Sequence, residues 1–169
     1  MKKWLGAALA LCLLLTACSE DSDSEKYASR PPVFADIVCT PLAEGETQIR
    51  AGQSFVVTAQ QERKGHLLNK STYQWSDVSG QLSHKYVTSV IYDNQPANPT
   101  DTIKAPTAGS YKLTFKARYN ASGNTSWWAQ QYGSSFQTSL ADNSGRATYT
   151  TGGLFYFDVT VEKTITVLP

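Results

Sequence analysis

The chain has 169 residues, with 15 Lys and Arg side chains against 14 Asp and Glu, so it is close to neutral. This balance argues against a nucleic-acid partner, because binding to phosphates calls for a concentrated basic surface. Without residues 1–17 the count is 13 basic against 14 acidic side chains, and the same argument holds. Residues 33–169 are numerous enough for one domain with a real hydrophobic core.

The N-terminus has the layout of a secretory signal. Lys2 and Lys3 precede an apolar run from Trp4 to Leu15. The run is too short to cross a bilayer as a helix, which needs about 20 apolar residues. A basic start, an apolar core and a polar stretch after it are typical of a signal peptide that is removed. We therefore expect residues 1–17 to be cleaved.

The end of this signal carries a more specific motif. Leu15-Thr16-Ala17-Cys18 resembles the lipobox of bacterial lipoproteins. The resemblance implies that the chain is cut before Cys18 and that this thiol is acylated, which anchors the protein in a membrane because two or three acyl chains bind stably. The alternative is an ordinary secretion signal in which the cysteine is incidental.

An acidic, Ser-rich run, Ser19-Glu20-Asp21-Ser22-Asp23-Ser24-Glu25, follows at once. It resembles the export signal of surface lipoproteins of Bacteroidota, which implies an outer-membrane protein that faces the cell surface rather than the periplasm. The alternative is a solvated spacer, since such composition is generically disordered. We expect residues 18–32 to form a disordered tether.

If Cys12 leaves with the signal and Cys18 carries lipid, Cys39 is the one cysteine left for the folded domain, and no intrachain disulfide can form. Its neighbours Ile37 and Val38 are apolar. The sequence therefore predicts a small buried strand residue at position 39 rather than a reactive thiol.

The folded part shows the two-residue period of strands with one buried face. Tyr111, Leu113 and Phe115 alternate with polar residues, and the same pattern runs from residue 155 to 167. Lys163 interrupts the second inward row, which predicts a bulge there or departure of the strand from the core. Shorter strands are predicted at residues 35–40, 54–60, 72–76 and 83–92, separated by turn residues.

Three segments in this part carry a resemblance. Residues 50–59 (RAGQSFVVTA), Tyr73-Gln74-Trp75 and residues 105–115 (APTAGSYKLTF) are similar to the immunoglobulin-like PKD domains of bacterial surface proteins. The resemblance implies an all-β, immunoglobulin-like antiparallel β-sandwich over residues 33–169. Trp75 would be its core tryptophan, and the alternation places Tyr111 and Phe115 in the same core.

The chain departs from that family at residues 120–154, where a long, aromatic-rich insertion separates the last two strands. Loops of this length in a compact domain are usually functional or disordered. Exposed aromatic rings stack on the apolar faces of sugars, and neighbouring amides satisfy the hydroxyls. The same cluster would suit a protein partner, or it would pack as a hairpin or lid over one edge of the sandwich. The candidate ligand-binding residues are Asn124, Trp127, Trp128, Gln130, Gln131 and Tyr132.

Catalytic motifs are missing from the sequence. His66 and His84 stand in polar settings without a cysteine or aspartate at motif spacing, and there is no nucleophile elbow, phosphate loop or metal-type Cys/His cluster. We expect no enzyme, no metal and no cofactor.

The sequence thus favours a lipid-anchored cell-surface binding or accessory module whose partner is a glycan or an envelope protein. The alternative is a structural spacer or an assembly subunit of a surface adhesin or appendage without a small ligand.

Overall fold

A computed structural model describes residues 26–77, 86–90, 98–153 and 155–169. The predicted signal peptide, Cys18, the acidic run, His84 and both ends of the strand predicted at residues 83–92 lie outside the described residues. Within the described residues, no helix is long and apolar enough to cross a membrane.

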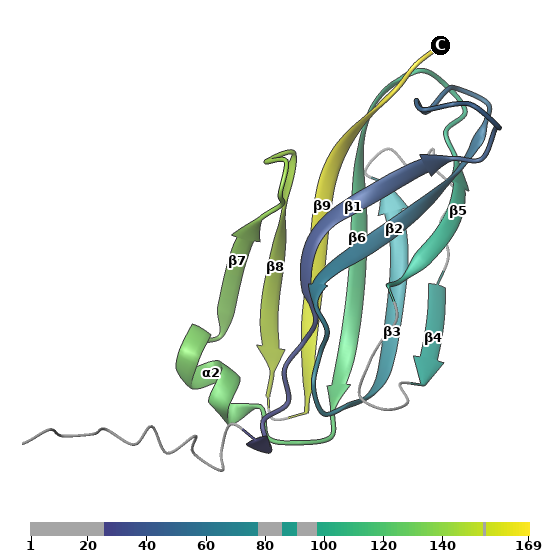
Figure 1. Ribbon diagram of the computed structural model, residues 1–169. Helices are drawn as coiled ribbons and strands as arrows, with labels where there is room; N and C mark the ends of the chain where they lie inside the picture. Colours follow the sequence, from purple (N-terminus) through teal and green to yellow (C-terminus); the bar gives the residue numbers. More distant parts are fainter. Residues whose placement is uncertain (1–25, 78–85, 91–97, 154) are drawn as a thin grey trace, which may run out of the picture.

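The described residues form two antiparallel sheets and one short helix (Figure 1). The smaller sheet has the order β1-β2-β5 and the larger has the order β4-β3-β6-β9-β8-β7. The chain is therefore all-β, consistent with the β-sandwich that the alternation predicted. The strands are β1 (Val33–Pro41), β2 (Ser54–Arg63), β3 (Leu68–Asp77), β4 (Tyr86–Val90), β5 (Thr100–Lys104), β6 (Gly109–Ala121), β7 (Ser135–Ser139), β8 (Gly145–Gly152) and β9 (Tyr156–Val167).

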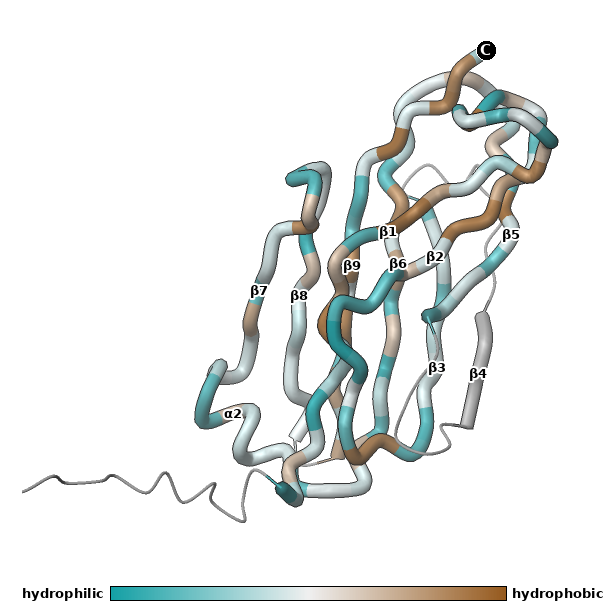
Figure 2. The backbone as a smooth tube through the Cα atoms, in the orientation of Figure 1, coloured by the Kyte–Doolittle hydropathy of each residue, from teal (hydrophilic) through white to brown (hydrophobic). Residues whose placement is uncertain are grey.

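The core lies between the two sheets, where apolar side chains of alternate residues meet. In Figure 2, brown, hydrophobic residues alternate with paler or teal ones along β9. Trp75 and Phe115 are 1% and 0% exposed, with ring centroids 4.9 Å apart. The ring centroid of Phe34, in the smaller sheet, lies 5.3 Å from that of Phe115. Tyr111, at 5% exposure, belongs to the same core.

The predicted bulge at Lys163 is wrong. β9 pairs with β6 and β8 in unbroken register through this residue, opposite Leu113 and Gly145. The Lys163 ammonium donates to both carboxylate oxygens of Asp36 on β1, at 2.8 and 2.9 Å, and lies 2.9 Å from an Asp142 oxygen. Because a charged amine can remain on an inward position when carboxylates meet it there, the strand does not need to leave the core.

The folded domain begins before residue 33, so residues 26–32 do not belong to a disordered tether as predicted. Ser29 is fully buried; its hydroxyl donates to the Leu67 carbonyl and accepts from the Gly123 amide. Its own amide donates to the Asn124 carbonyl. This segment connects the β2–β3 turn to the loop after β6, which gives its buried polar groups partners.

Residues 120–154 are mostly ordered secondary structure rather than a long loop. Helix α2 (Ser126–Tyr132) is followed by the hairpin β7–β8, which extends the larger sheet beyond β9 (Figure 1). Asn143 in the hairpin turn has a φ of 56°, a left-handed conformation that Asn tolerates well. The segment lies between the last two strands of the pattern, as predicted, and its hairpin matches one of the alternatives left open. Strand β5 was not predicted.

Candidate functional site

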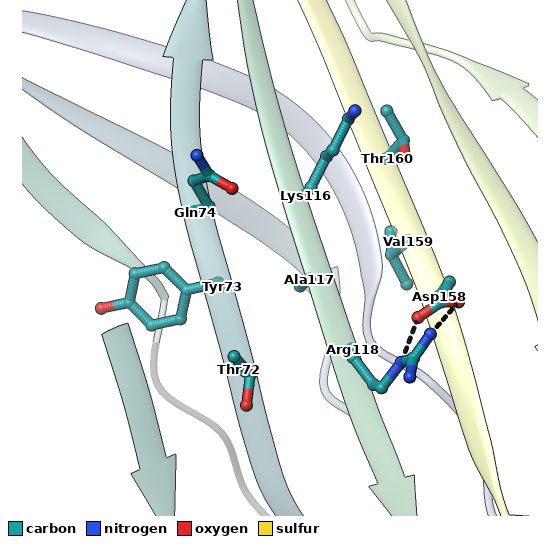
Figure 3. Close-up of a pocket in the computed structure, with 9 residues that line it drawn as sticks. All are labelled: Thr72, Tyr73, Gln74, Lys116, Ala117, Arg118, Asp158, Val159 and Thr160. Atoms are coloured by element: carbon teal, nitrogen blue, oxygen red, sulfur yellow. Dashed lines mark hydrogen bonds and ion pairs between the residues drawn. The ribbon is translucent and has the colours of Figure 1, made fainter. Parts of the chain in front are cut away.

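The described surface has several hollows of similar volume, about 410–420 Å³, and the linings of two of them include aromatic residues. One is a shallow depression of about 410 Å³ on the outer face of β3, β6 and β9 (Figure 3). The other is a groove of about 420 Å³ between the ends of β1 and β2 and the α2–β7 segment.

Two of the three charged side chains that line the outer depression, Arg118 and Asp158, form an ion pair with each other. Arg118 and Asp158 point together in Figure 3, with two nitrogen–oxygen distances of 2.8 Å. The Arg118 guanidinium also lies 3.8 Å from the centre of the Tyr156 ring. Because a ligand would have to displace this bidentate, stacked arrangement, the depression is the weaker candidate.

The groove near α2, by contrast, is lined by aromatic rings. We call it the aromatic groove. Tyr132 and Phe136 are partly buried residues whose ring centroids are 4.8 Å apart. Glu62 and Arg63, at the exposed end of β2, contribute one charge of each sign. The lining residues are Val33, Glu62, Arg63, Trp128, Tyr132, Phe136 and Thr138.

The short helix α2 positions these rings. Trp128 and Tyr132 are four residues apart, so they lie on one helix face, with ring centroids 4.2 Å apart. Trp128 also contacts Tyr149 and Phe157 of the larger sheet, at 6.2 and 5.9 Å between centroids. Anchored by Trp128, the helix holds Tyr132 at the mouth of the groove.

Trp128 is therefore a core residue and not an exposed platform, because only 2% of it is exposed. A sugar ring needs a free aromatic face to stack on, and neighbouring rings occupy the faces of Trp128. The planes of Trp128 and Tyr132 are tilted by 38°, so the two rings do not form a flat surface.

The other four predicted residues lie outside the aromatic groove. Trp127 is partly buried against the core, and the Arg30 guanidinium lies 5.3 Å from its ring centre. The Asn124 side chain accepts a hydrogen bond from the Ser126 amide at 2.7 Å, which orders the start of α2. Gln130 and Gln131 are exposed. Of the six candidates, only Trp128 and Tyr132 line the aromatic groove.

Sequence reasoning missed the other half of the groove. Phe136 stood in the aromatic-rich segment, but Val33, Glu62 and Arg63 come from strands distant in sequence. No local pattern marks them, because an exposed Glu-Arg pair at the end of a strand is common. The packing of α2 against the sheet brings them together.

The described residues offer no group of three or more His, Cys, Asp or Glu side chains that could hold a metal ion. Burial raises the pKa of the Cys39 thiol to about 12, an effect that Lys163 nearby only partly offsets. A thiol with such a pKa is almost entirely protonated at neutral pH and is a poor nucleophile.

Comparisons of the chain with known proteins give no match. No protein-family model matches it, and neither the curated proteins nor the solved structures contain a match.

Proposed function

We propose that this chain is a lipid-anchored, non-enzymatic binding module of the bacterial cell surface, and that the aromatic groove is its ligand site. The lipobox at Cys18 and the acidic run behind it support the anchor and the outward-facing location. The observation that carries the binding role is a groove lined by aromatic rings next to one acidic and one basic side chain.

The strand order supports an immunoglobulin-like arrangement for this module. In such an arrangement β1, β2 and β5 would be strands A, B and E, and β4, β3, β6 and β9 would be C′, C, F and G. The helix α2 and the hairpin β7–β8 would then be an addition between F and G. They build one wall of the groove, so the departure from the family coincides with the proposed site.

The chemistry of the groove suits a glycan. The rings of Tyr132 and Phe136 offer apolar contact for the C–H groups of a sugar. Glu62 accepts hydrogen bonds from hydroxyls, and Arg63 donates them. The volume, about 420 Å³, lies in the range of small-ligand sites.

The proposed site lies at the anchored end of the domain. The purple, N-terminal end of the described chain and α2 lie at the same end of the sandwich, and the C-terminus lies at the opposite end (Figure 1). Residues 19–25 separate Cys18 from this end, and even a fully extended chain would span at most about 28 Å there. The ligand would therefore be bound close to the membrane, as expected for an accessory to an envelope system.

A glycan array probed with the chain from residue 19 onward tests the proposal, and calorimetry on the best ligand gives the affinity. Tyr132→Ala should weaken binding about tenfold or more, because it removes a stacking ring. Phe155→Ala is the matched control, since Phe155 is an aromatic residue that is 74% exposed and lies outside the groove. Binding that is equally strong in both variants would contradict the assignment of the groove, and absence of any glycan ligand would contradict the ligand class.

The anchor needs a separate test. In the intact bacterium, a Cys18→Ala variant should leave the membrane fraction, and the wild-type protein should incorporate labelled fatty acid. An unlabelled wild-type protein would contradict the lipid anchor, whatever the groove binds.

The alternative role, an assembly subunit, is favoured by one observation: β7 is an edge strand whose outer side pairs with no strand of the described chain.

A further inference from the structure

The edge strands of the two sheets differ in how their main-chain groups are satisfied. At the edge of β1, the Phe34 amide donates to the Tyr149 hydroxyl at 2.9 Å. The Ala35 carbonyl accepts from the Ala141 amide at 3.0 Å. On β5, the Asp101 carboxylate accepts from the Thr102 amide at 2.8 Å. Such local capping keeps an edge from pairing with another chain.

Among the described residues, β7 has no such capping group. The hydrogen bonds that flank it, from the Thr151 amide to Ser134 and from the Leu140 amide to Gly145, show which residues face β8. Since hydrogen-bonded residues alternate in an antiparallel pair, the main-chain groups of the odd-numbered residues point away from β8. These are Ser135, Gln137 and Ser139, all exposed.

The side chains of β7 do not discourage pairing either. The strand reads Ser-Phe-Gln-Thr-Ser, with no charged residue and no proline, and its register with β8 has no bulge. Charges, prolines and bulges are the usual devices by which an edge strand avoids another strand. An edge with none of them is suited to receive a strand.

We propose that the strand it receives is β7 of a second copy of this chain. An antiparallel two-fold axis through Gln137 would pair this residue with itself and Ser135 with Ser139 of the other copy. These pairs would form about six main-chain hydrogen bonds. The two larger sheets would become one continuous sheet with an isologous interface.

The side chains match under this symmetry. Phe136 lies opposite Thr138 of the second copy, an aromatic–β-branched pair of the kind that stabilises antiparallel sheets. No like charges meet, because β7 carries none. The proposed pairing of β7 with β7 of a second copy does not depend on what the aromatic groove binds.

Disulfide trapping of the full-length chain in its own membranes tests the pairing. In a Cys39→Ala background, Gln137→Cys should form a disulfide-linked dimer on mild oxidation, because a directly opposed pair has its Cα atoms about 5.5 Å apart. Thr148→Cys is the matched control: Thr148 pairs with Gln137 one strand inward, too far from its symmetry mate to be linked. The Cys39→Ala background alone measures any linkage through Cys18.

We expect the dimer band to be at least tenfold stronger for Gln137→Cys than for both controls. Equal bands would overturn the proposal, and so would an adduct whose mass identifies a different protein as the strand donor.

A second measurement covers the uncrosslinked protein. Gln137→Lys should convert the detergent-extracted dimer to a monomer in light scattering, whereas Thr148→Lys, with the same charge on the adjacent strand, should leave it dimeric. A wild-type protein that is monomeric at membrane-like concentrations would also overturn the proposal. Glycan binding by such a monomer would leave the proposed function intact.

Discussion

The hydroxyl of Tyr149 accepts a hydrogen bond from the Phe34 amide at 2.9 Å, although 115 positions separate the two residues. Tyr149 belongs to the β7–β8 hairpin, and Phe34 belongs to the first strand of the opposite sheet. Both residues are buried, at 0% and 1% exposure. The hairpin is thus an integral part of the sandwich, because it supplies the acceptor for a buried amide of the opposite sheet.

Tyr149→Phe should lower the free energy of unfolding by about 1–3 kcal/mol, because it leaves the buried Phe34 amide without an acceptor. Tyr119→Phe provides the control. Tyr119 is equally buried, but its hydroxyl has no hydrogen-bond partner among the described residues. Urea unfolding should show little cost for Tyr119→Phe, and equal costs for both variants would contradict the assigned role of the Tyr149 hydroxyl.

Trp128→Ala should destabilise the domain by about 3–5 kcal/mol, because it empties a large, fully packed site. Trp127→Ala should cost about 1 kcal/mol, since Trp127 is only partly buried. The comparison by urea unfolding separates packing from ligand binding at neighbouring tryptophans. A small cost at Trp128 would mean that the ring is not the anchor of α2.

Lys163→Gln should lower the free energy of unfolding by about 2 kcal/mol at neutral pH, because it removes charge-assisted hydrogen bonds to Asp36 and Asp142. Lys112→Gln is the control. Lys112 pairs with Glu162 at 2.7 Å, but 45% of its side chain is exposed, so its loss should cost less than about 1 kcal/mol. Denaturant titrations of both variants measure the difference.

The Lys163 effect should also depend on pH. Burial lowers the pKa of Lys163, but the hydrogen bonds to Asp142 and Asp36 outweigh this and raise it above 10.5. The hydrogen bonds of Asp142 to Lys163 and Ser144 lower its pKa below 3.8. The stabilisation is therefore lost as the pH rises through the first pKa or falls through the second. A wild-type-to-variant difference that increased at either extreme would contradict this assignment.

The Cys39 thiol should react slowly with a disulfide reagent at pH 8 in the chain from residue 19 onward, where it is the one cysteine. Because burial raises its pKa from 9.0 to about 12, the thiolate fraction falls about a thousandfold relative to an ordinary thiol. Unfolding in guanidinium should restore fast labelling. A native rate close to the unfolded rate would show that the thiol is accessible and ionised.

The sequence by itself predicted most of the strands. Alternation along residues 111–119 and 155–167 matches β6 and β9, because a strand with one buried face records that burial every second residue. The family resemblance, rather than the alternation, implied that Trp75 is a core residue, and Trp75 is 1% exposed. Strand β5 escaped detection because its residues are mostly polar: it lies at a sheet edge and buries one side chain, Ile103.

The secondary structure between positions 120 and 154 could not be predicted from local patterns. Local signals there include glycines, serines and aromatic residues, which suit a loop, a helix or a hairpin equally well. The tertiary structure decided among them, because Trp128 packs against Phe157 of β9 and the Tyr149 hydroxyl accepts a hydrogen bond from Phe34 of β1. Lys163 is a similar case: its place in the core depends on Asp36 and Asp142, which no spacing rule connects to it.

There is a physical reason why some features are determined by the sequence and others only by the tertiary structure. Burial of one strand face follows from consecutive residues, so the chain alone determined the β-rich fold class. The patterns that predict a signal peptide and a lipobox also lie in consecutive residues. The aromatic groove and the free edge of β7 depend on which segments lie side by side. Only the packing of α2 and the hairpin beyond β9 brought Glu62, Arg63 and Tyr132 around one hollow and left β7 at the edge.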